Sequence, residues 1–217
     1  PITMNSKKNP ELNIITQDYI IGLEVKSPSI VEHAKNRTNK HYQMLARHKV
    51  ILDILPKEHT TLPKDNPVKD FLLSADRKFS SFKEKYTNYI SILYIIWDDY
   101  INEPISAILT KPHGLFMEDS FAKDKNGNSL KFQNVDFVIL SRHRYQLHCM
   151  AGEKPFVDQV DHPLDYGQRE RFPFKVIIKN PHSSAILTDD IVNCFQVYIP
   201  SELLGAEYCP SDVISWS

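Results

Sequence analysis

Residues 11–26, ELNIITQDYIIGLEVK, decide the expected fold of this chain. Isoleucine and leucine recur in two short runs, and the polar pair Gln17-Asp18 separates them. This pattern predicts a hairpin of two antiparallel strands with its turn at Gln17-Asp18. The cross-strand pairs expected from that turn are Glu11 with Glu24, Asn13 with Gly22, and Ile15 with Ile20.

Strand alternation gives the two faces of this hairpin different chemistry. Glu11, Glu24 and Lys26 fall on one face, whereas the other face is mostly apolar and is expected to join the core. Like charges that face each other across a strand pair repel, so Glu11 and Glu24 need a neutralising partner. Mg²⁺ suits this role, because it prefers oxygen ligands and is typically held by one or two carboxylates. Lys26 could orient a water molecule or stabilise charge on a phosphate.

Pro10-Glu11 followed by Glu24-Val25-Lys26 resembles the PD-(D/E)xK motif of the restriction-endonuclease-like nucleases. The resemblance covers about residues 10–97 and implies a mixed sheet flanked by helices. It also implies that Glu11, Glu24 and the Val25 carbonyl bind Mg²⁺ or Mn²⁺, and that Lys26 assists phosphodiester hydrolysis. Catalytic roles are therefore expected for Glu11, Glu24 and Lys26.

Two departures from the family pattern matter. The first acid is Glu11 where the family more often has Asp, which leaves Asp18 open as the alternative acid, although its expected turn position disfavours it. The family core also begins with a helix and a strand before the first acid, and we expect these to precede Pro1 in a larger chain or complex. A helix after the ExK strand often adds a polar residue to the family's site, and Gln43 is the candidate.

The rest of the chain predicts a mixed α/β sheet with helices packed against it. Helices are expected over residues 30–55 and from Asn66-Pro67 onward, where Pro67 suits the first helical position. Strands are expected over residues 89–97, 135–140, 174–178 and 194–199, with a turn at Asn126-Gly127. The predicted fold class is α/β, a restriction-endonuclease-like core over residues 1–150 with a C-terminal β-rich elaboration of the same domain over residues 151–217.

Charge indicates where nucleic acid could bind. The chain is 41% hydrophobic and 24% charged with a net charge of −1, so an anionic partner must be held by a local patch. The segment after Lys26 is strongly basic, and its first serines could donate to a phosphate at a helix N-terminus. The candidate nucleic-acid-binding residues are Ser27, Ser29, Lys35, Arg37, Lys40, Gln43 and Arg47.

Composition excludes several other classes of protein. No segment approaches about 18 consecutive apolar residues, so no membrane partner is expected. The three cysteines have no CxxC spacing and are odd in number, which favours a reducing, cytoplasmic setting. The resemblance implies DNA more than RNA as the substrate, a role in restriction or defence, and dimerisation to cut both strands.

Two other functions remain open from the sequence. The first is a non-catalytic module that binds nucleic acid or protein and retains the nuclease fold; the Glu11 departure favours it. The second is a Cys/His hydrolase centred on Cys149 and His148, for which the spacing places no third orienting group. A solvated ion pair is the simplest structural alternative for an isolated Glu-x-Lys in a strand.

Overall fold

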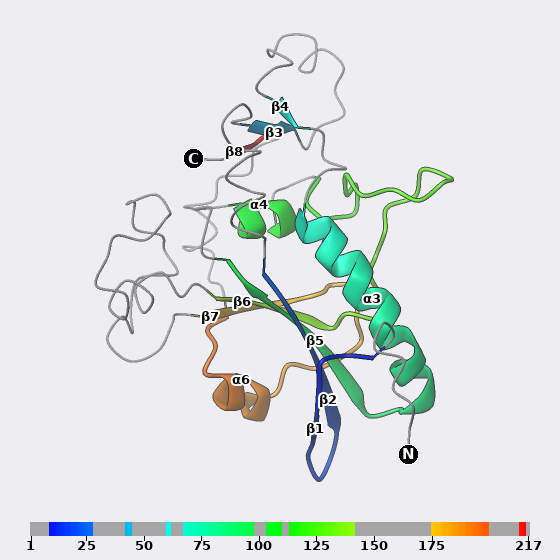
Figure 1. Ribbon diagram of the computed structural model, residues 1–217, viewed down its shortest axis with the longest axis vertical. Helices are drawn as coiled ribbons and strands as arrows, with labels where there is room; N and C mark the ends of the chain where they lie inside the picture. Colours follow the sequence, from blue (N-terminus) through cyan, green and yellow to red (C-terminus); the bar gives the residue numbers. More distant parts are fainter. Residues whose placement is uncertain are drawn as a thin grey trace, which may run out of the picture.

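A computed structural model describes residues 9–27, 42–44, 60–61, 67–97, 103–109, 113–141, 175–199 and 213–215. The main element is a mixed five-stranded sheet with the strand order β1-β2-β5-β6-β7 (Figure 1). The strands are β1 (Leu12–Ile15), β2 (Ile20–Lys26), β5 (Tyr89–Ile96), β6 (Phe137–Ser141) and β7 (Lys175–Lys179). β2, β5 and β6 are parallel, whereas β1 and β7 run antiparallel to their neighbours.

The β1–β2 hairpin has the predicted register. Asn13 pairs with Gly22 and Ile15 pairs with Ile20, as expected from a turn at Gln17-Asp18. Thr16 closes the turn, because its backbone N–H and its hydroxyl both donate to the Tyr19 carbonyl, at 2.9 and 2.8 Å. The alternation of the sequence therefore placed the two strands correctly.

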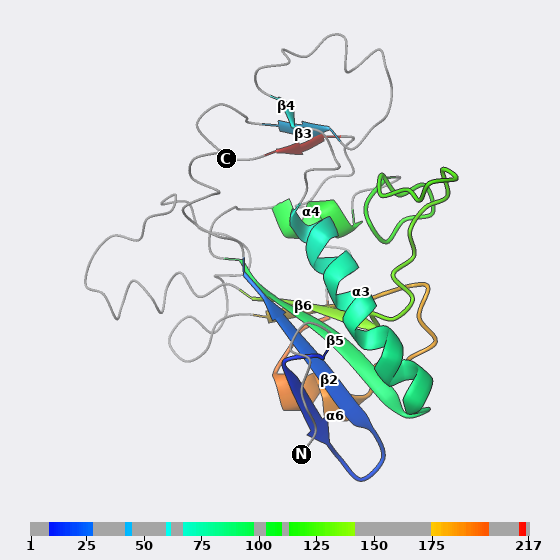
Figure 2. The same ribbon diagram turned by 45° about the vertical axis from the view of Figure 1, so that its right-hand side comes forward.

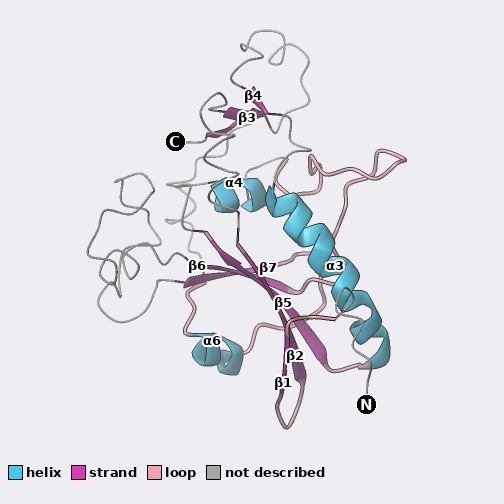
Figure 3. Cartoon of the chain, in the orientation of Figure 1, coloured by secondary structure: helices cyan, strands magenta, loops and turns pink. Residues whose placement is uncertain are grey.

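Helix α3 (Pro67–Lys85) covers one face of the sheet and begins at the predicted Pro67 (Figure 3). Its buried residues recur at intervals of three and four, as an amphipathic helix requires; they are Val68, Leu72, Ala75 and Phe79. Each large side chain of this kind contributes about 1.5–3 kcal/mol when it leaves water. The stripe packs against alternate residues of β5, so the helix lies directly over β2 and β5.

Two shorter helices complete the layers. α4 (Glu103–Leu109) contributes Ile105 and Ile108 to the same apolar cluster as α3. α6 (Asp189–Phe195) packs Ile191 against the opposite face of the sheet, together with Ile21 and Ile92 (Figure 2). The described chain thus has three layers, in which helices cover both faces of an α/β sheet.

The predicted helix over residues 30–55 is wrong at residues 42–44. These residues form β3 (Tyr42–Met44), the middle strand of a second, three-stranded sheet with β4 (Thr60–Thr61) and β8 (Val213–Ser215). β3 pairs in parallel with β4 and antiparallel with β8. Pairing with a strand from the far end of the chain overrides the local helical spacing of apolar residues.

The predicted strand over residues 194–199 is also wrong in its first half. Cys194 and Phe195 belong to α6, whose N-cap is Thr188, with Asp189 and Asp190 in the first turn. The Thr188 side chain accepts from the Ile191 N–H, and acidic residues at a helix N-terminus are favourable. Gln196 then ends the helix with a φ of 51°, and Tyr198 forms a β-bridge with Val176.

The other strand predictions are confirmed within one or two residues. β6 (Phe137–Ser141) and β7 (Lys175–Lys179) correspond to the segments expected at 135–140 and 174–178. Gly127 has a φ of 85° in the turn expected at Asn126-Gly127. In the part of the chain that the structure describes, no helix has both the length and the apolarity needed to span a membrane.

Candidate functional site

Glu24 is a fully buried carboxylate near the end of β2, on the sheet face that α3 covers. Two ammonium groups lie on the same oxygen of this carboxylate. Lys26 Nζ is 2.7 Å from Glu24 Oε1, and Lys78 Nζ is 2.5 Å from it. The sequence predicted the Glu24–Lys26 pair, and the structure brings these two residues together.

Lys78 was not predicted, and it comes from α3, 54 residues along the chain from Glu24. It lies three residues after Ala75 and directly before Phe79, at the margin of the buried helical stripe. A lysine at the margin of an apolar stripe is the sequence signal that could have indicated it. Such a lysine usually covers apolar surface with its methylene chain and keeps its charge in water, whereas the Lys78 ammonium group contacts Glu24 on β2.

The second oxygen of Glu24 distinguishes this site from a closed ion pair. Glu24 Oε2 is buried and has no hydrogen-bond partner among the described residues. A buried acceptor without a partner is costly, commonly by about 1–3 kcal/mol, and is rare in folded proteins. The oxygen is therefore a candidate ligand atom for a group that the described residues do not supply.

A second buried carboxylate on the same face, Asp136, has hydrogen-bond donors on both of its oxygen atoms. Asp136, just before β6, accepts from Lys83 Nζ and Ser183 Oγ on one oxygen. Its other oxygen accepts from the Ser91 backbone N–H at 2.8 Å and from Ser91 Oγ at 2.9 Å. Donors from Lys83, Ser183 and the Ser91 backbone N–H satisfy both oxygens of Asp136, and these contacts fix the starts of β5 and β6.

Glu11 lies immediately before β1 and is exposed. The β1–β2 ladder ends at the pair Leu12–Leu23, one step short of the predicted Glu11–Glu24 pair, and Glu11 lies in a bend before β1. The same face carries Asn13, whose side-chain oxygen accepts from the Tyr89 hydroxyl at 3.1 Å. Burial, with a smaller contribution from the charge of Asp136, raises the pKa of Tyr89, so this phenol stays protonated and remains a donor.

Gly22 makes this arrangement possible. A Cβ atom at residue 22 would lie 1.6 Å from the Tyr89 hydroxyl oxygen, which is far inside any allowed contact. The tyrosine ring therefore crosses β2 through the space that a larger residue would fill. Because residue 22 has no side chain, Tyr89 of β5 can reach across β2 and hydrogen-bond Asn13 of β1, the strand that Glu11 precedes.

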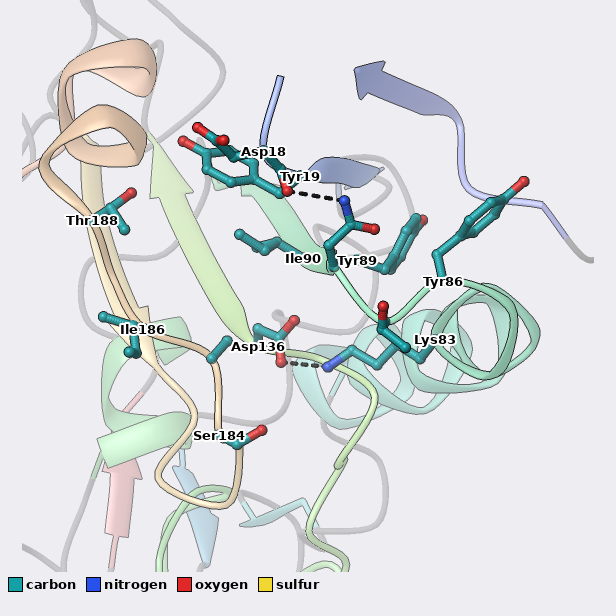
Figure 4. A pocket seen from close by; sticks show the side chains of 13 residues that line it. Asp18, Tyr19, Lys83, Tyr86, Tyr89, Ile90, Asp136, Ser184, Ile186 and Thr188 are labelled. Atoms are coloured by element: carbon teal, nitrogen blue, oxygen red, sulfur yellow. Dashed lines mark hydrogen bonds and ion pairs between the residues drawn. The ribbon is translucent and has the colours of Figure 1, made fainter. Parts of the chain in front are cut away.

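Asp18, the alternative acid, is separated from Glu24 by most of β2. It lies in the hairpin turn, and its backbone oxygen accepts from Asn88 Nδ2 at 2.9 Å. Six residues of strand correspond to about 20 Å. Asp18 instead lines a cleft of about 510 Å³ with Tyr19, Lys83 and Asp136 (Figure 4). Lys83 and Asp136 form an ion pair at this cleft, so these two side chains neutralise each other.

The remaining predicted site residues are placed only in part. Val25 and Ser27 adjoin Glu24 and Lys26 along the chain, with Ser27 exposed directly after β2. Gln43 lies in β3 rather than in a helix. Outside the described residues are Ser29, Lys35, Arg37, Lys40, Arg47, His148 and Cys149.

Glu24 Oε2 is an oxygen atom of the type that binds a hard divalent cation, although two ammonium groups already lie on Oε1. The described residues hold no group of three or more His, Cys, Asp or Glu side chains arranged to bind a metal ion. Mg²⁺ does not need such a group, because it is usually bound by one or two carboxylates and keeps several waters. Glu24 Oε2, with Glu11 expected opposite it, supplies oxygen ligands of the kind that Mg²⁺ prefers.

Comparisons of the chain with protein-family models, with curated proteins and with solved structures gave no match. The residues around Glu24 and the order of the elements that hold them are therefore the indications of function.

Proposed function

We propose that the protein is a Mg²⁺-dependent nuclease that hydrolyses phosphodiester bonds, with DNA as the preferred substrate. The observation that carries the proposal is the buried Glu24 carboxylate, which has two lysines on one oxygen and no partner on the other among the described residues. A carboxylate, a cation site and nearby ammonium groups are the components that phosphodiester hydrolysis requires.

Each side chain has a distinct role in this proposal. Glu24 and Glu11, with the Val25 carbonyl, would hold Mg²⁺ or Mn²⁺, which supplies positive charge and a bound water of lowered pKa. Lys26 orients the attacking water and stabilises charge on the phosphate. Lys78 reaches the same carboxylate from α3 and would contact a phosphate oxygen of the substrate. Burial of Glu24 under α3 strengthens these interactions, because water screens them less.

The order of the elements supports the proposal. The acid before β1, the Glu24-Val25-Lys26 end of β2, the helix α3 and the parallel strand β5 come in the order that the resemblance to the restriction-endonuclease-like nucleases implies, with β3 and β4 inserted between β2 and α3. Proteins with the same order of strands and helices can have many different functions. The contacts of Glu24 with its two lysines are therefore stronger support for the proposal than the order of the elements.

A non-catalytic binding module is the second candidate. Lys26 and Lys78 together neutralise Glu24 without any metal ion, as a structural ion cluster would. In that case the two lysines hold α3 on β2, and binding of nucleic acid does not depend on a divalent cation. The Glu24–Lys26–Lys78 cluster would then matter for stability alone.

Cleavage assays separate the two candidates. Duplex DNA, single-stranded DNA and RNA are incubated with the full chain in Mg²⁺, in Mn²⁺ and in EDTA, beside Glu24→Ala and Lys26→Ala. The nuclease predicts metal-dependent cleavage of at least one substrate that both substitutions abolish while the circular dichroism spectrum is retained. Metal-independent binding without cleavage, unchanged in Glu24→Ala, would favour the binding module.

A further inference from the structure

Lys78 and Lys26 occupy the same carboxylate oxygen, but they differ in how the fold supplies them. Lys26 is on the strand of Glu24 itself, two residues away, whereas Lys78 is brought by α3. The Lys78 side chain is 17% exposed, and its ammonium group contacts the buried carboxylate, so the contact is only partly shielded from solvent. A flexible four-carbon chain can move that charge a short distance without moving the helix.

The charges around Glu24 leave little room for a further cation. Glu24 carries one negative charge, and the two ammonium groups on its Oε1 atom carry two positive charges. A divalent cation on Oε2 would lie within a few ångströms of both ammonium groups, in a region where burial weakens screening. The exposed Glu11 can offset only part of this repulsion. The positive charge of Lys78 therefore disfavours binding of a metal ion at Glu24.

We infer that Lys78 competes with a divalent cation for the Glu24 carboxylate, and that a nucleic-acid phosphate relieves the competition by accepting the Lys78 ammonium group. The inference depends on the proposed metal-dependent site and adds how that site is regulated. A phosphodiester oxygen offers Lys78 a charge-assisted hydrogen bond equivalent to the one it gives up. Metal and phosphate then bind with positive coupling, because each removes a charge that disfavours the other.

The consequence is that metal affinity in the absence of nucleic acid is set by Lys78. Loss of this one charge should tighten Mn²⁺ binding about tenfold, the change that corresponds to one interaction of ordinary strength at a partly buried site. It should also remove most of the coupling between metal and phosphate. A purely structural lysine would have the opposite effect, because its loss would loosen α3 over β2 and weaken the metal site.

The test measures Mn²⁺ binding to the full chain by electron paramagnetic resonance, without nucleic acid and at matched protein concentration. Lys78→Met keeps the aliphatic chain and a good helix former but removes the charge. Lys78→Arg keeps the charge. Lys85→Met is the matched control, since Lys85 is exposed on the same helix and lies against Tyr86 rather than Glu24. Glu24→Gln identifies the site, and circular dichroism confirms that each variant is folded.

The inference predicts that Lys78→Met binds Mn²⁺ about tenfold more tightly than the wild type, while Lys78→Arg and Lys85→Met do not. The gain must disappear when Glu24→Gln is added. Equal or weaker binding by Lys78→Met, with Glu24-dependent binding in the wild type, would overturn the inference and leave the proposed metal site standing. Absence of Glu24-dependent binding in both the wild type and Lys78→Met would overturn both.

Discussion

Glu24 and Asp136 are two buried carboxylates on one face of the sheet, and only Asp136 has both of its oxygen atoms hydrogen-bonded within the described residues. Each receives a lysine from α3: Lys78 reaches Glu24, and Lys83 reaches Asp136. Because the two carboxylates share their burial and helix, the difference between them lies in the remaining partners. Asp136 is completed by serines, whereas Glu24 keeps an oxygen available.

This difference predicts that substitution at Asp136 lowers the free energy of unfolding more than substitution at Glu24. Asp136→Ala leaves Lys83, Ser91 and Ser183 without their acceptor and should lower the free energy of unfolding by about 3 kcal/mol or more. Glu24→Gln keeps the volume and an amide oxygen that the partly exposed Lys26 and Lys78 can still contact, so the loss should be smaller, about 1–2 kcal/mol. Urea unfolding of both variants beside the wild type checks the prediction. A larger loss for Glu24→Gln than for Asp136→Ala would show that Glu24 is the structural carboxylate.

Glu11 and Asp18 can be distinguished as the first acid of the site. Glu11 directly precedes Leu12, which pairs with Leu23 beside Glu24, while Asp18 lies in the turn at the other end of β2. Glu11→Gln should therefore lower the rate of DNA cleavage at least tenfold, and Asp18→Asn should leave it within about twofold. Initial cleavage rates at saturating Mg²⁺ give the comparison. The reverse ranking of the two variants would assign the site to Asp18 and contradict the hairpin geometry.

Gly22 should be intolerant of even one added methyl group. Gly22→Ala places a Cβ atom on the Tyr89 hydroxyl and must displace the ring that contacts Asn13. We expect a loss of about 1–3 kcal/mol in the free energy of unfolding, as for other overpacked cores. Thermal unfolding of Gly22→Ala, alone and in a Tyr89→Leu background, measures the effect. The penalty should shrink in the double variant; an equal penalty in both backgrounds would mean that Tyr89 is not its cause.

The stability of the chain should carry a pH dependence from His182. Burial, reinforced by the positive charge of Lys131 and partly offset by Glu118, lowers the pKa of His182 below its ordinary value of 6.5. The unfolded chain then binds a proton at this residue more readily than the folded chain does. The contribution of His182 to the free energy of unfolding is fully present above pH 6.5. It is lost as the pH falls from 6.5 through the lower pKa of the folded state.

The measurement is a comparison of the wild type with His182→Gln, because other histidines titrate in the same range. The wild type should lose more unfolding free energy than His182→Gln between pH 7.5 and pH 5.5, both chosen as about one unit from the ordinary pKa. An NMR titration of the His182 ring gives the folded pKa directly. A folded pKa at or above the ordinary value would contradict the prediction.

The parts of the fold that the sequence predicts are those whose determinants are local. The hairpin register follows from alternation around Gln17-Asp18, and α3 follows from the stripe of Val68, Leu72, Ala75 and Phe79 after Pro67. β3 could not be predicted in this way, because its partners β4 and β8 lie elsewhere in the chain. The short helix α6 begins at the Thr188 N-cap. In the sequence, this cap indicates a helix less strongly than the neighbouring β-branched residues indicate a strand.

The same reasoning applies to the candidate site. Glu24 and Lys26 are two residues apart on one strand, so strand geometry alone brings their charges together. Lys78 is 54 residues from Glu24, and only the packing of α3 on the sheet reveals it. The contrast between Glu24 and Asp136 was likewise invisible in the sequence, because it depends on Ser91 and Ser183 from other segments.

The most direct test of the account is single-turnover cleavage of end-labelled duplex and single-stranded DNA in Mg²⁺ by the wild type, Lys26→Met and Lys85→Met. Lys26 contacts Glu24 at 2.7 Å, whereas Lys85 is exposed at the end of the same helix that carries Lys78. The account predicts cleavage by the wild type and Lys85→Met, its suppression by EDTA, and a loss of at least about a hundredfold in Lys26→Met at unchanged stability. Wild-type rates in Lys26→Met, or no cleavage of either DNA by the folded wild type, would contradict it.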